Sequence, residues 1–326
     1  MVISKRVAVI VSALLASCGA LAQQPAGPGD YPNRPLRFVI GFLPGGVSDT
    51  IGRVVGERLS RELGQQILID SRPGAGGVVA MEIVAKATPD GYTWYLAQPV
   101  LTISKLFKNK PPFDPVKALA PVTQLGTGPT VLVVHPSVPV KAVPELIALA
   151  RSQREPMAYG SSGAGSTNHF AGALFAIMAK VRLLHVPYRG AAANSVAVMQ
   201  GEIPMAFQPL AAAIPHLQSK RLKGIAVTGA KRARAVPELP TIGDTLPGYR
   251  VEAWYGIVVP ANTPEPIIQY LSARTNKVLA MPEVGDILLK RGVEVEGSTP
   301  EQFSALIQED AIRWKKLVEE AGIRFD

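Results

Sequence analysis

The sequence predicts an α/β fold of two lobes, with the second lobe inserted into the first. Short apolar segments typical of buried strands alternate with amphipathic helical segments, and glycine or proline turns separate them. This pattern runs from about residue 36 to residue 97 and then restarts at Thr130. Of the 326 residues 47% are hydrophobic and 18% are charged, which favours a sizeable core and excludes wholesale disorder.

The first lobe begins with the apolar strand Leu36–Phe42, which Pro44-Gly45-Gly46 interrupts. Ser48 and Asp49 are helix-capping residues, and apolar residues at helical spacing follow until Gly64. Glycine and proline turns bound the other elements in the same way. We therefore expect strands at residues 36–42, 66–70, 92–97 and 254–260, and helices at 50–63, 78–87, 264–280, 283–291 and 300–321.

The second lobe repeats this alternation with shorter elements. We expect strands at residues 130–135, 157–160, 183–187, 203–207 and 223–228, and helices at 143–151, 167–180 and 191–200. A proline-rich basic loop covers 230–248, and the chain crosses between lobes near 125–130 and 249–256. The predicted organisation is residues 31–126 with 256–326 as the first lobe, and 127–255 as the second.

The N-terminus has the layout of a secretory signal peptide. Lys5 and Arg6 precede an apolar run of about ten residues, half of what a membrane-spanning helix needs. Ala20-Leu21-Ala22 is an A-x-A cleavage site, which predicts a signal peptide over 1–22 and a linker over 23–30. Leu15-Ala16-Ser17-Cys18 also resembles a lipobox, so lipoprotein anchoring at Cys18 stays open. Either route places the mature protein outside the cytoplasm, and we expect it in the periplasm.

The charge balance is basic but dispersed. Loss of Lys5 and Arg6 with the signal leaves 32 basic and 25 acidic residues, a net charge of +7. The densest cluster, Lys231-Arg232-Ala233-Arg234, lacks interleaved aromatic residues, so we expect no nucleic-acid partner. A surface that attracts small anions is a better use of this surplus. The single cysteine excludes an intramolecular disulfide framework.

Two loops share one design, and each connects a strand end to a helix start. They are Pro44–Asp49 in the first lobe and Ser161–Thr167 in the second. Backbone N–H groups and the positive end of the helix dipole favour anions there, and glycines let a ligand approach the backbone. In open α/β sheets ligands bind at this edge. One such loop in each lobe predicts a ligand cleft between the lobes, with Phe42 as an aromatic wall.

The catalytic alternatives are weaker. Gly160-Ser161-Ser162-Gly163-Ala164 is not a G-x-S-x-G nucleophile elbow, and no dinucleotide or phosphate-loop motif is complete. The four histidines are far apart in sequence, so we expect neither a metal nor a cofactor. An exported serine hydrolase using Ser162 or Ser166 with His169 remains a formal alternative. His169 is equally compatible with ligand binding or helix capping.

The motifs around these loops resemble those of the Bug-type extracytoplasmic solute receptors, the periplasmic binding components of tripartite tricarboxylate transporters. The resemblance covers essentially the whole mature chain, in order. It is carried by Phe42-x-Pro44-Gly45-Gly46-x-x-Asp49, Arg72-Pro73-Gly74-Ala75-Gly76-Gly77, Pro89-Asp90-Gly91-Tyr92-Thr93, Tyr159-Gly160-Ser161-Ser162-Gly163-x-Gly165-Ser166-x-x-His169, His185-Val186-Pro187-Tyr188-x-Gly190, Trp254-x-Gly256 and Pro260-x-x-Thr263-Pro264.

The resemblance implies a type II periplasmic-binding-protein fold that closes on a small mono- or dicarboxylate without performing chemistry. It implies that Gly45 and Gly46 hold one carboxylate while Asp49 braces their loop. Many relatives have an acidic residue after the strand ending at Phe207, where this chain has Gln208, so an amino group on the ligand is less expected there. The expected binding residues are Phe42, Gly45, Gly46, Asp49, Gln98, Ser162, Gly163, Ser166, His169, Tyr188, Arg189, Gly190 and Gln208.

The resemblance further implies that the receptor delivers its ligand to the membrane permease subunits of a tripartite tricarboxylate transporter. We expect a monomer. Presentation of the closed form to a membrane kinase is an alternative that the sequence does not separate from transport.

Overall fold

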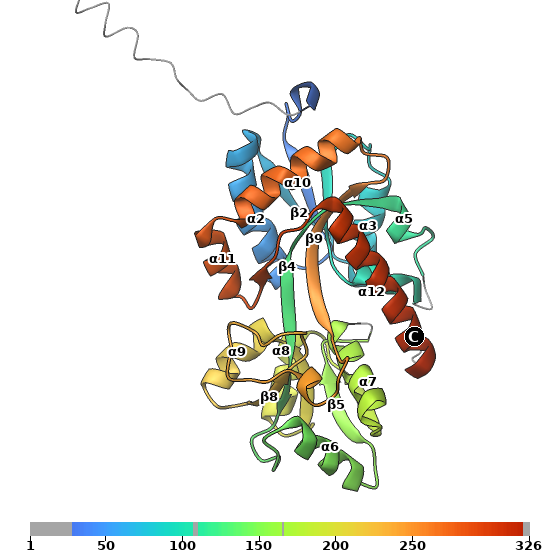
Figure 1. Ribbon diagram of the computed structural model, residues 1–326, viewed down its shortest axis with the longest axis vertical. Helices are drawn as coiled ribbons and strands as arrows, with labels where there is room; N and C mark the ends of the chain where they lie inside the picture. Colours follow the sequence, from blue (N-terminus) through green and yellow to red (C-terminus); the bar gives the residue numbers. More distant parts are fainter. Residues whose placement is uncertain (1–27, 107–109, 165, 322–326) are drawn as a thin grey trace, which may run out of the picture.

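The computed structural model describes residues 28–106, 110–164 and 166–321. It has two lobes, and the long strands β4 (Leu119–Val134) and β9 (Glu252–Pro260) run between them (Figure 1). The predicted α/β class and two-lobed architecture are confirmed. The predicted signal peptide and Cys18 lie outside the described residues. Within the described ranges, no helix has both the length and the apolar character needed to cross a membrane.

The first lobe is built on the strand order β2-β1-β3-β9, in which β1 is parallel to β2 and β3, and β9 is antiparallel to β3. Helices cover both faces, and Phe38, Trp94 and Ile257 belong to one of its two buried clusters. Its elements are η1 (Pro28–Asp30), β1 (Leu36–Ile40), α2 (Val47–Leu63), β2 (Ile67–Ser71), η2 (Ala75–Gly77), α3 (Val78–Ala85), β3 (Thr93–Ala97), α4 (Val100–Ile103), η3 (Ser104–Leu106), α5 (Pro115–Ala118), α10 (Glu265–Leu279), α11 (Pro282–Leu289), β10 (Glu294–Val295) and α12 (Pro300–Ala321).

The second lobe is built on the order β4-β7-β5-β6. Here β5 is parallel to β6 and β7, whereas β4 is antiparallel to β7 and β8. Its remaining elements are α6 (Val143–Ser152), β5 (Met157–Ser161), α7 (Thr167–Ala179), β6 (Leu183–Pro187), α8 (Ala191–Met199), β7 (Met205–Pro209), α9 (Leu210–Gln218), β8 (Lys223–Val227) and η4 (Ile242–Asp244).

Strand β4 joins the two sheets by changing partners along its length. It pairs with β9 from Leu119 to Pro129, and with β7 from Thr130 onward. We predicted only the second part, from Thr130, because Pro121, Gly126 and Pro129 disfavour a strand interior. The register shifts twice within the first part, between Pro121 and Thr123 and between Gln124 and Gly126, so the irregularities adjoin Pro121 and Gly126, whereas Pro129 pairs with Glu252 in regular register.

Helix α12 contacts both lobes. The Phe303 ring near its start packs edge-on against Trp254 of β9, with ring centroids 5.5 Å apart. Farther along, Trp314 is fully buried with its ring 4.5 Å from that of Phe170 in α7. The lobes are therefore held together by two strands and by one helix that packs across them.

Two local predictions are corrected. Helix α2 begins at Val47 rather than Thr50, with Gly46 as its N-cap, so Ser48 and Asp49 lie inside the first turn. Helix α9 was not predicted at all. Its segment contains Pro215 and has no side-chain cap at its start, where Pro209 is the N-cap residue. The residue boundaries that we assigned to the lobes stay a prediction. The two residues at which we placed them, Gly126 of β4 and Tyr255 of β9, are register partners in the sheet.

Candidate ligand-binding site

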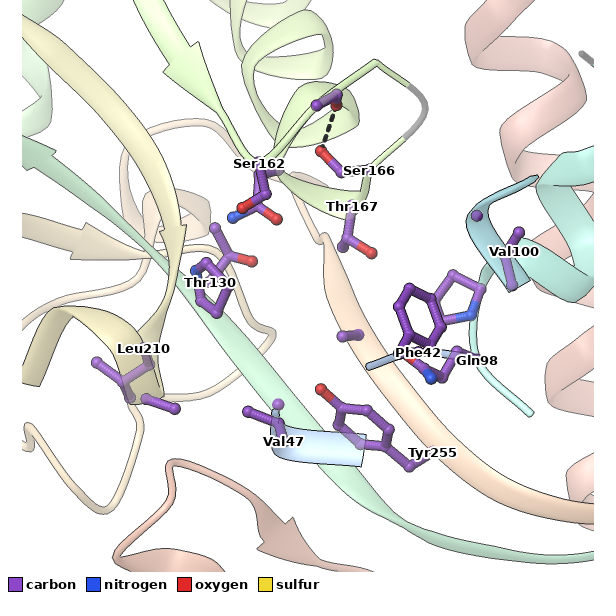
Figure 2. Close-up of a pocket in the computed structure, with 18 of the residues that line it drawn as sticks. Phe42, Val47, Gln98, Val100, Thr130, Ser162, Ser166, Thr167, Leu210 and Tyr255 are labelled. Atoms are coloured by element: carbon purple, nitrogen blue, oxygen red, sulfur yellow. Dashed lines mark hydrogen bonds between the residues drawn. The ribbon is translucent and has the colours of Figure 1, made fainter. Parts of the chain in front are cut away.

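A cavity of about 530 Å³ lies between the lobes. Both lobes and both crossing strands line it, and Figure 2 shows side chains from each converging on the space. The lining residues are Phe42, Val47, Gly76, Val78, Gln98, Pro99, Val100, Ile103, Arg291 and Gly292 from the first lobe; Gly128, Pro129, Thr130, Ala253 and Tyr255 from the crossing strands; and Ser162, Gly163, Ala164, Ser166, Thr167, Asn168, Pro209, Leu210 and Ala211 from the second.

Four helices of eight or more residues begin at this cavity. Val47, Val78, Thr167 and Leu210 are the first residues of α2, α3, α7 and α9, and all four line the cavity. The first N–H groups of a helix have no partner within the helix, and the dipole places partial positive charge there. Arg291 is the only charged residue among the described lining residues. The electrostatic character of the cavity therefore favours an anion.

The second-lobe loop is held by its own serines. The Ser166 hydroxyl donates to the Gly163 carbonyl at 2.7 Å and accepts from the backbone N–H of His169 at 3.2 Å, which caps α7. The Ser162 hydroxyl is buried and has no hydrogen-bond partner among the described residues. Ser162 lines the cavity, and contact of its hydroxyl with a ligand stays a prediction. Of the predicted residues, this loop places Ser162, Gly163 and Ser166 on the cavity.

The first-lobe loop is braced as the resemblance implied. Gly45 has a φ of +87°, in the left-handed region that favours glycine, and its N–H donates to Asp49 Oδ2 at 3.0 Å. Arg53 Nε donates to both Asp49 oxygens at 2.9 and 3.0 Å, and this hydrogen bond lowers the pKa of the Asp49 carboxyl. Gly45, Gly46 and Asp49 do not line the cavity; Val47 of the same loop does. The ligand-binding role of the two glycines stays a prediction.

Phe42 and Gln98 stand on the first-lobe side of the cavity, where β1 and β3 end (Figure 2). The Gln98 amide donates to Ser48 Oγ at 3.0 Å, which ties the end of β3 to the first turn of α2. Sequence order alone placed both residues correctly at the carboxyl ends of strands. Their contact with a ligand is a prediction that rests on this position.

The segment Tyr188–Gly190 lies behind the Ser162 loop rather than on the cavity. Gly190 donates its N–H to the Ser162 carbonyl at 3.2 Å, and the Tyr188 hydroxyl donates to Glu202 at 2.9 Å. Arg189 is exposed and does not line the cavity. This segment therefore supports the loop that carries Ser162, and a direct role in binding remains a prediction.

His169 is part of a buried pair. Its ring stacks on that of His185 with centroids 3.8 Å apart and an interplanar angle of 10°. Burial lowers the pKa of His169 to about 3 and that of His185 to about 4, so both rings are neutral at neutral pH. His185 Nε2 lies 2.7 Å from Ser161 Oγ. The Ser166 hydroxyl accepts from the backbone N–H of His169, so this contact is the helix cap that the sequence allowed.

Gln208 is fully buried one residue before the cavity wall at Pro209. Its Oε1 accepts from the Ser195 hydroxyl at 2.6 Å, while its Nε2 has no partner among the described residues. The position at which many relatives have an acid thus holds a neutral amide in this chain, and that amide forms a hydrogen bond with Ser195.

Sequence reasoning missed several lining residues. Arg291 precedes Gly292, which has a φ of +68° after α11, and this helix-ending pattern is too common to indicate a site. Tyr255 of β9 also lines the cavity, and burial raises the pKa of its hydroxyl to about 12, so it is neutral at neutral pH. The start of α9 at Leu210 could not be found because the helix itself was not predicted.

The chain matches the model of the tripartite tricarboxylate transporter family receptor over residues 51–323. Among curated proteins it is 34% identical over 292 residues to a UPF0065 protein in the tcbD-tcbE intergenic region of Pseudomonas sp. strain P51, covering 89% of this chain and 87% of that protein. It is 27% identical over 322 residues to Protein BugT of Bordetella pertussis, covering 98% of each.

Solved structures agree with this match. A protein of R. palustris, Rpa4515 with adipate, superposes with a TM-score of 0.80 at 32% identity, covering 90% of this chain and 99% of that one. MatC from Rhodopseudomonas palustris with bound malate gives 0.75 at 29% identity, covering 88% and 100%. The aliphatic sulphonate binding protein SsuA of Escherichia coli, at 12% identity and a TM-score of 0.56, shares the fold alone.

The predicted fold is thus confirmed as that of the periplasmic solute-binding proteins, which act as receptors and not as enzymes. The serine hydrolase alternative is not supported. Together with the two-lobed architecture and the cavity between the lobes, the match over most of its length shows that this chain belongs to the tripartite tricarboxylate transporter receptor family, as its resemblance to the Bug receptors implied.

Proposed function

We propose that the protein captures a small organic carboxylate in the cavity between its lobes. The observation that carries this proposal is the convergence of four helix N-termini and one arginine on a cavity whose described lining residues include no acid. A carboxylate there accepts hydrogen bonds from backbone N–H groups and gains from four helix dipoles. The adipate and malate bound to two similar structures, each about 30% identical, support the same ligand class.

The position of each residue at the cavity suggests its role in holding the carboxylate. Ser162 donates its unpartnered hydroxyl to the carboxylate, Ser166 keeps the loop and the start of α7 in place, and Arg291 supplies the charge. Ligand contacts from both lobes stabilise the closed state, because a ligand shifts a conformational equilibrium only by its differential affinity. Gly45 and Gly46 extend the anion site at the first-lobe loop, and Asp49 fixes that loop.

We also propose where the protein works and which partner it serves. The protein is exported by its signal peptide, works in the periplasm as a monomer, and delivers its ligand to the membrane subunits of a tripartite transporter. The family match supports delivery. Uptake of a labelled carboxylate that is lost when the gene is deleted, and is restored by the intact gene, tests it.

The binding experiment compares two arginines by isothermal titration with a carboxylate and its uncharged carboxamide. We expect the carboxylate to bind and the carboxamide to bind at least tenfold more weakly. Arg291→Gln should weaken carboxylate binding about tenfold or more, since a hydrogen bond to a charged group contributes about 1.5–3 kcal/mol. Arg221→Gln is the matched control, because Arg221 is exposed just beyond the far end of α9. Equal affinity for acid and amide would contradict the proposal.

A further inference from the structure

The size of the cavity bears on the size of the ligand. Its volume of about 530 Å³ lies within the range of about 300–1,000 Å³ that is usual for pockets that bind drug-sized ligands. A four-carbon dicarboxylate has fewer atoms than such a ligand and would leave part of this space to water. The cavity therefore has room for a ligand with a larger body.

The wall that such a body would meet is apolar. Phe42, Val78, Val100 and Ile103 line the first-lobe side, and Leu210 lines the opposite side. In Figure 2 Phe42, Gln98 and Val100 lie on one side of the space, and Ser162, Ser166 and Thr130 lie on the other. Apolar side chains predominate on the first-lobe side, with Gln98 among them, and Leu210 adds an apolar side chain on the side of Thr130.

The apolar first-lobe wall restricts what the ligand can place against it. A hydroxyl or a second charge placed against the valine and isoleucine side chains would lose its water without gaining a partner, which is unfavourable. A hydrocarbon chain or ring placed there would gain about 0.8 kcal/mol for each CH₂ group removed from water. We place one carboxylate at Ser162 and the start of α7, and we assign Arg291, the charged residue among the described lining residues, to a second carboxylate where the ligand has one.

We propose that the ligand of this receptor is a carboxylate with an apolar body of about six carbons or more, a chain or a ring, rather than a four-carbon hydroxy-dicarboxylate. The inference rests on the proposed carboxylate-binding function and narrows its ligand class. Its basis is the volume of the cavity together with the apolar side chains of Phe42, Val78, Val100 and Ile103 on its first-lobe side.

Isothermal titration with succinate, adipate and suberate holds the charge constant while the apolar body grows. We expect the affinity to rise about fourfold for each added CH₂, which is the 0.8 kcal/mol of burial expressed as a ratio. Adipate should then bind about 15-fold more tightly than succinate, and malate no more tightly than succinate. Benzoate and phenylacetate report whether a ring is accepted in place of the chain.

Two variants locate the effect on the apolar wall. Val100→Thr keeps the shape of the side chain but adds a hydroxyl, and it should reduce the preference for adipate over succinate at least threefold. Val79→Thr is the matched control, since Val79 is 41% exposed and does not line the cavity. Thermal unfolding checks that both variants fold.

The outcomes separate the two proposals. If succinate or malate binds more tightly than adipate and suberate, the apolar-body inference is wrong while the carboxylate receptor stands. If none of these acids binds but their carboxamides do, the proposed function itself fails. A preference for adipate that Val100→Thr leaves unchanged would overturn the assignment of the wall.

Discussion

The contact between Gly292 and Ala211 offers the sharpest test of lobe closure. Gly292 follows α11 in the first lobe, whereas Ala211 lies in the first turn of α9 in the second lobe, and both line the cavity. A Cβ atom added to Gly292 would lie 2.7 Å from the Ala211 nitrogen and 2.9 Å from its Cα, well inside the 3.4 Å of ordinary contact. Gly292→Ala should therefore hinder the approach of the lobes.

Two free-energy effects can be separated in this variant. Gly292 has a φ of +68°, and placing alanine there costs about 1–2 kcal/mol of stability in any state of the protein. The clash with Ala211 adds about 1–3 kcal/mol, the usual cost of overpacking, but only when the lobes are closed. On the proposal that ligand stabilises the closed lobes, the second cost falls on ligand binding and corresponds to a roughly 5- to 150-fold higher Kd.

The assay measures Kd by titration calorimetry and unfolding free energy by urea for the same variants. Gly248→Ala controls for backbone strain, since Gly248 has a φ of +88° and an added Cβ would meet nothing within 4 Å. Gly285→Ala controls for local sequence, because Gly285 lies inside α11 with open space around it. If Gly292→Ala leaves Kd unchanged while losing more stability than Gly248→Ala, the contact does not depend on closure and the reasoning is refuted.

Three further predictions concern buried polar groups. Ser162→Ala should raise the Kd for a carboxylate about tenfold or more in titration calorimetry. It should change the unfolding free energy by less than about 0.5 kcal/mol in urea, because the Ser162 hydroxyl has no partner among the described residues. A large stability loss with an unchanged Kd would contradict this. Burial lowers the pKa of His169 to about 3 and that of His185 to about 4 in the folded protein, below the ordinary value of about 6.5. The unfolded chain therefore binds protons at a higher pH than the folded protein does, and the unfolding free energy should fall as the pH drops from about 6.5 towards 4. His169→Phe should flatten that pH dependence in urea unfolding, and an unaltered slope would argue against the assignment. Asp310→Asn should cost about 1–3 kcal/mol of unfolding free energy, because it removes the charge of a buried carboxylate that pairs with Arg313 and accepts from the Trp254 indole at 3.1 Å and from a threonine hydroxyl at 2.7 Å. A loss below about 0.5 kcal/mol would show that this network contributes little.

The fold was largely predictable because its strands are short, apolar and bounded by glycine or proline. The exceptions are informative. The first part of β4 contains Pro121 and Pro129, and it is a strand only because β9 pairs with it along most of its length. Helix α9 begins without a capping side chain directly after β7, so no local signal marked its start. Both elements depend on tertiary partners that sequence periodicity does not reveal.

The residues that line the cavity also divide into those that the sequence indicates and those that it does not. Phe42, Gln98 and Ser162 line the cavity because each lies just beyond a strand end, a position that is readable from the chain. Arg291 and Tyr255 line it because of long-range packing: α11 sits against α2, and β9 passes between the lobes. Their residue types and neighbours in sequence indicate nothing about a ligand, so they emerged only from the three-dimensional arrangement.

The most direct test of the central claim is a crystal structure of the protein with a carboxylate such as adipate, from crystals that are soaked in, or grown with, a saturating concentration of the acid. We predict density for the acid between the lobes, with one carboxylate within hydrogen-bond distance of Ser162 Oγ and of backbone N–H groups at the start of α7. An acid bound elsewhere on the surface, or a cavity that holds only water at saturating ligand, would contradict the account.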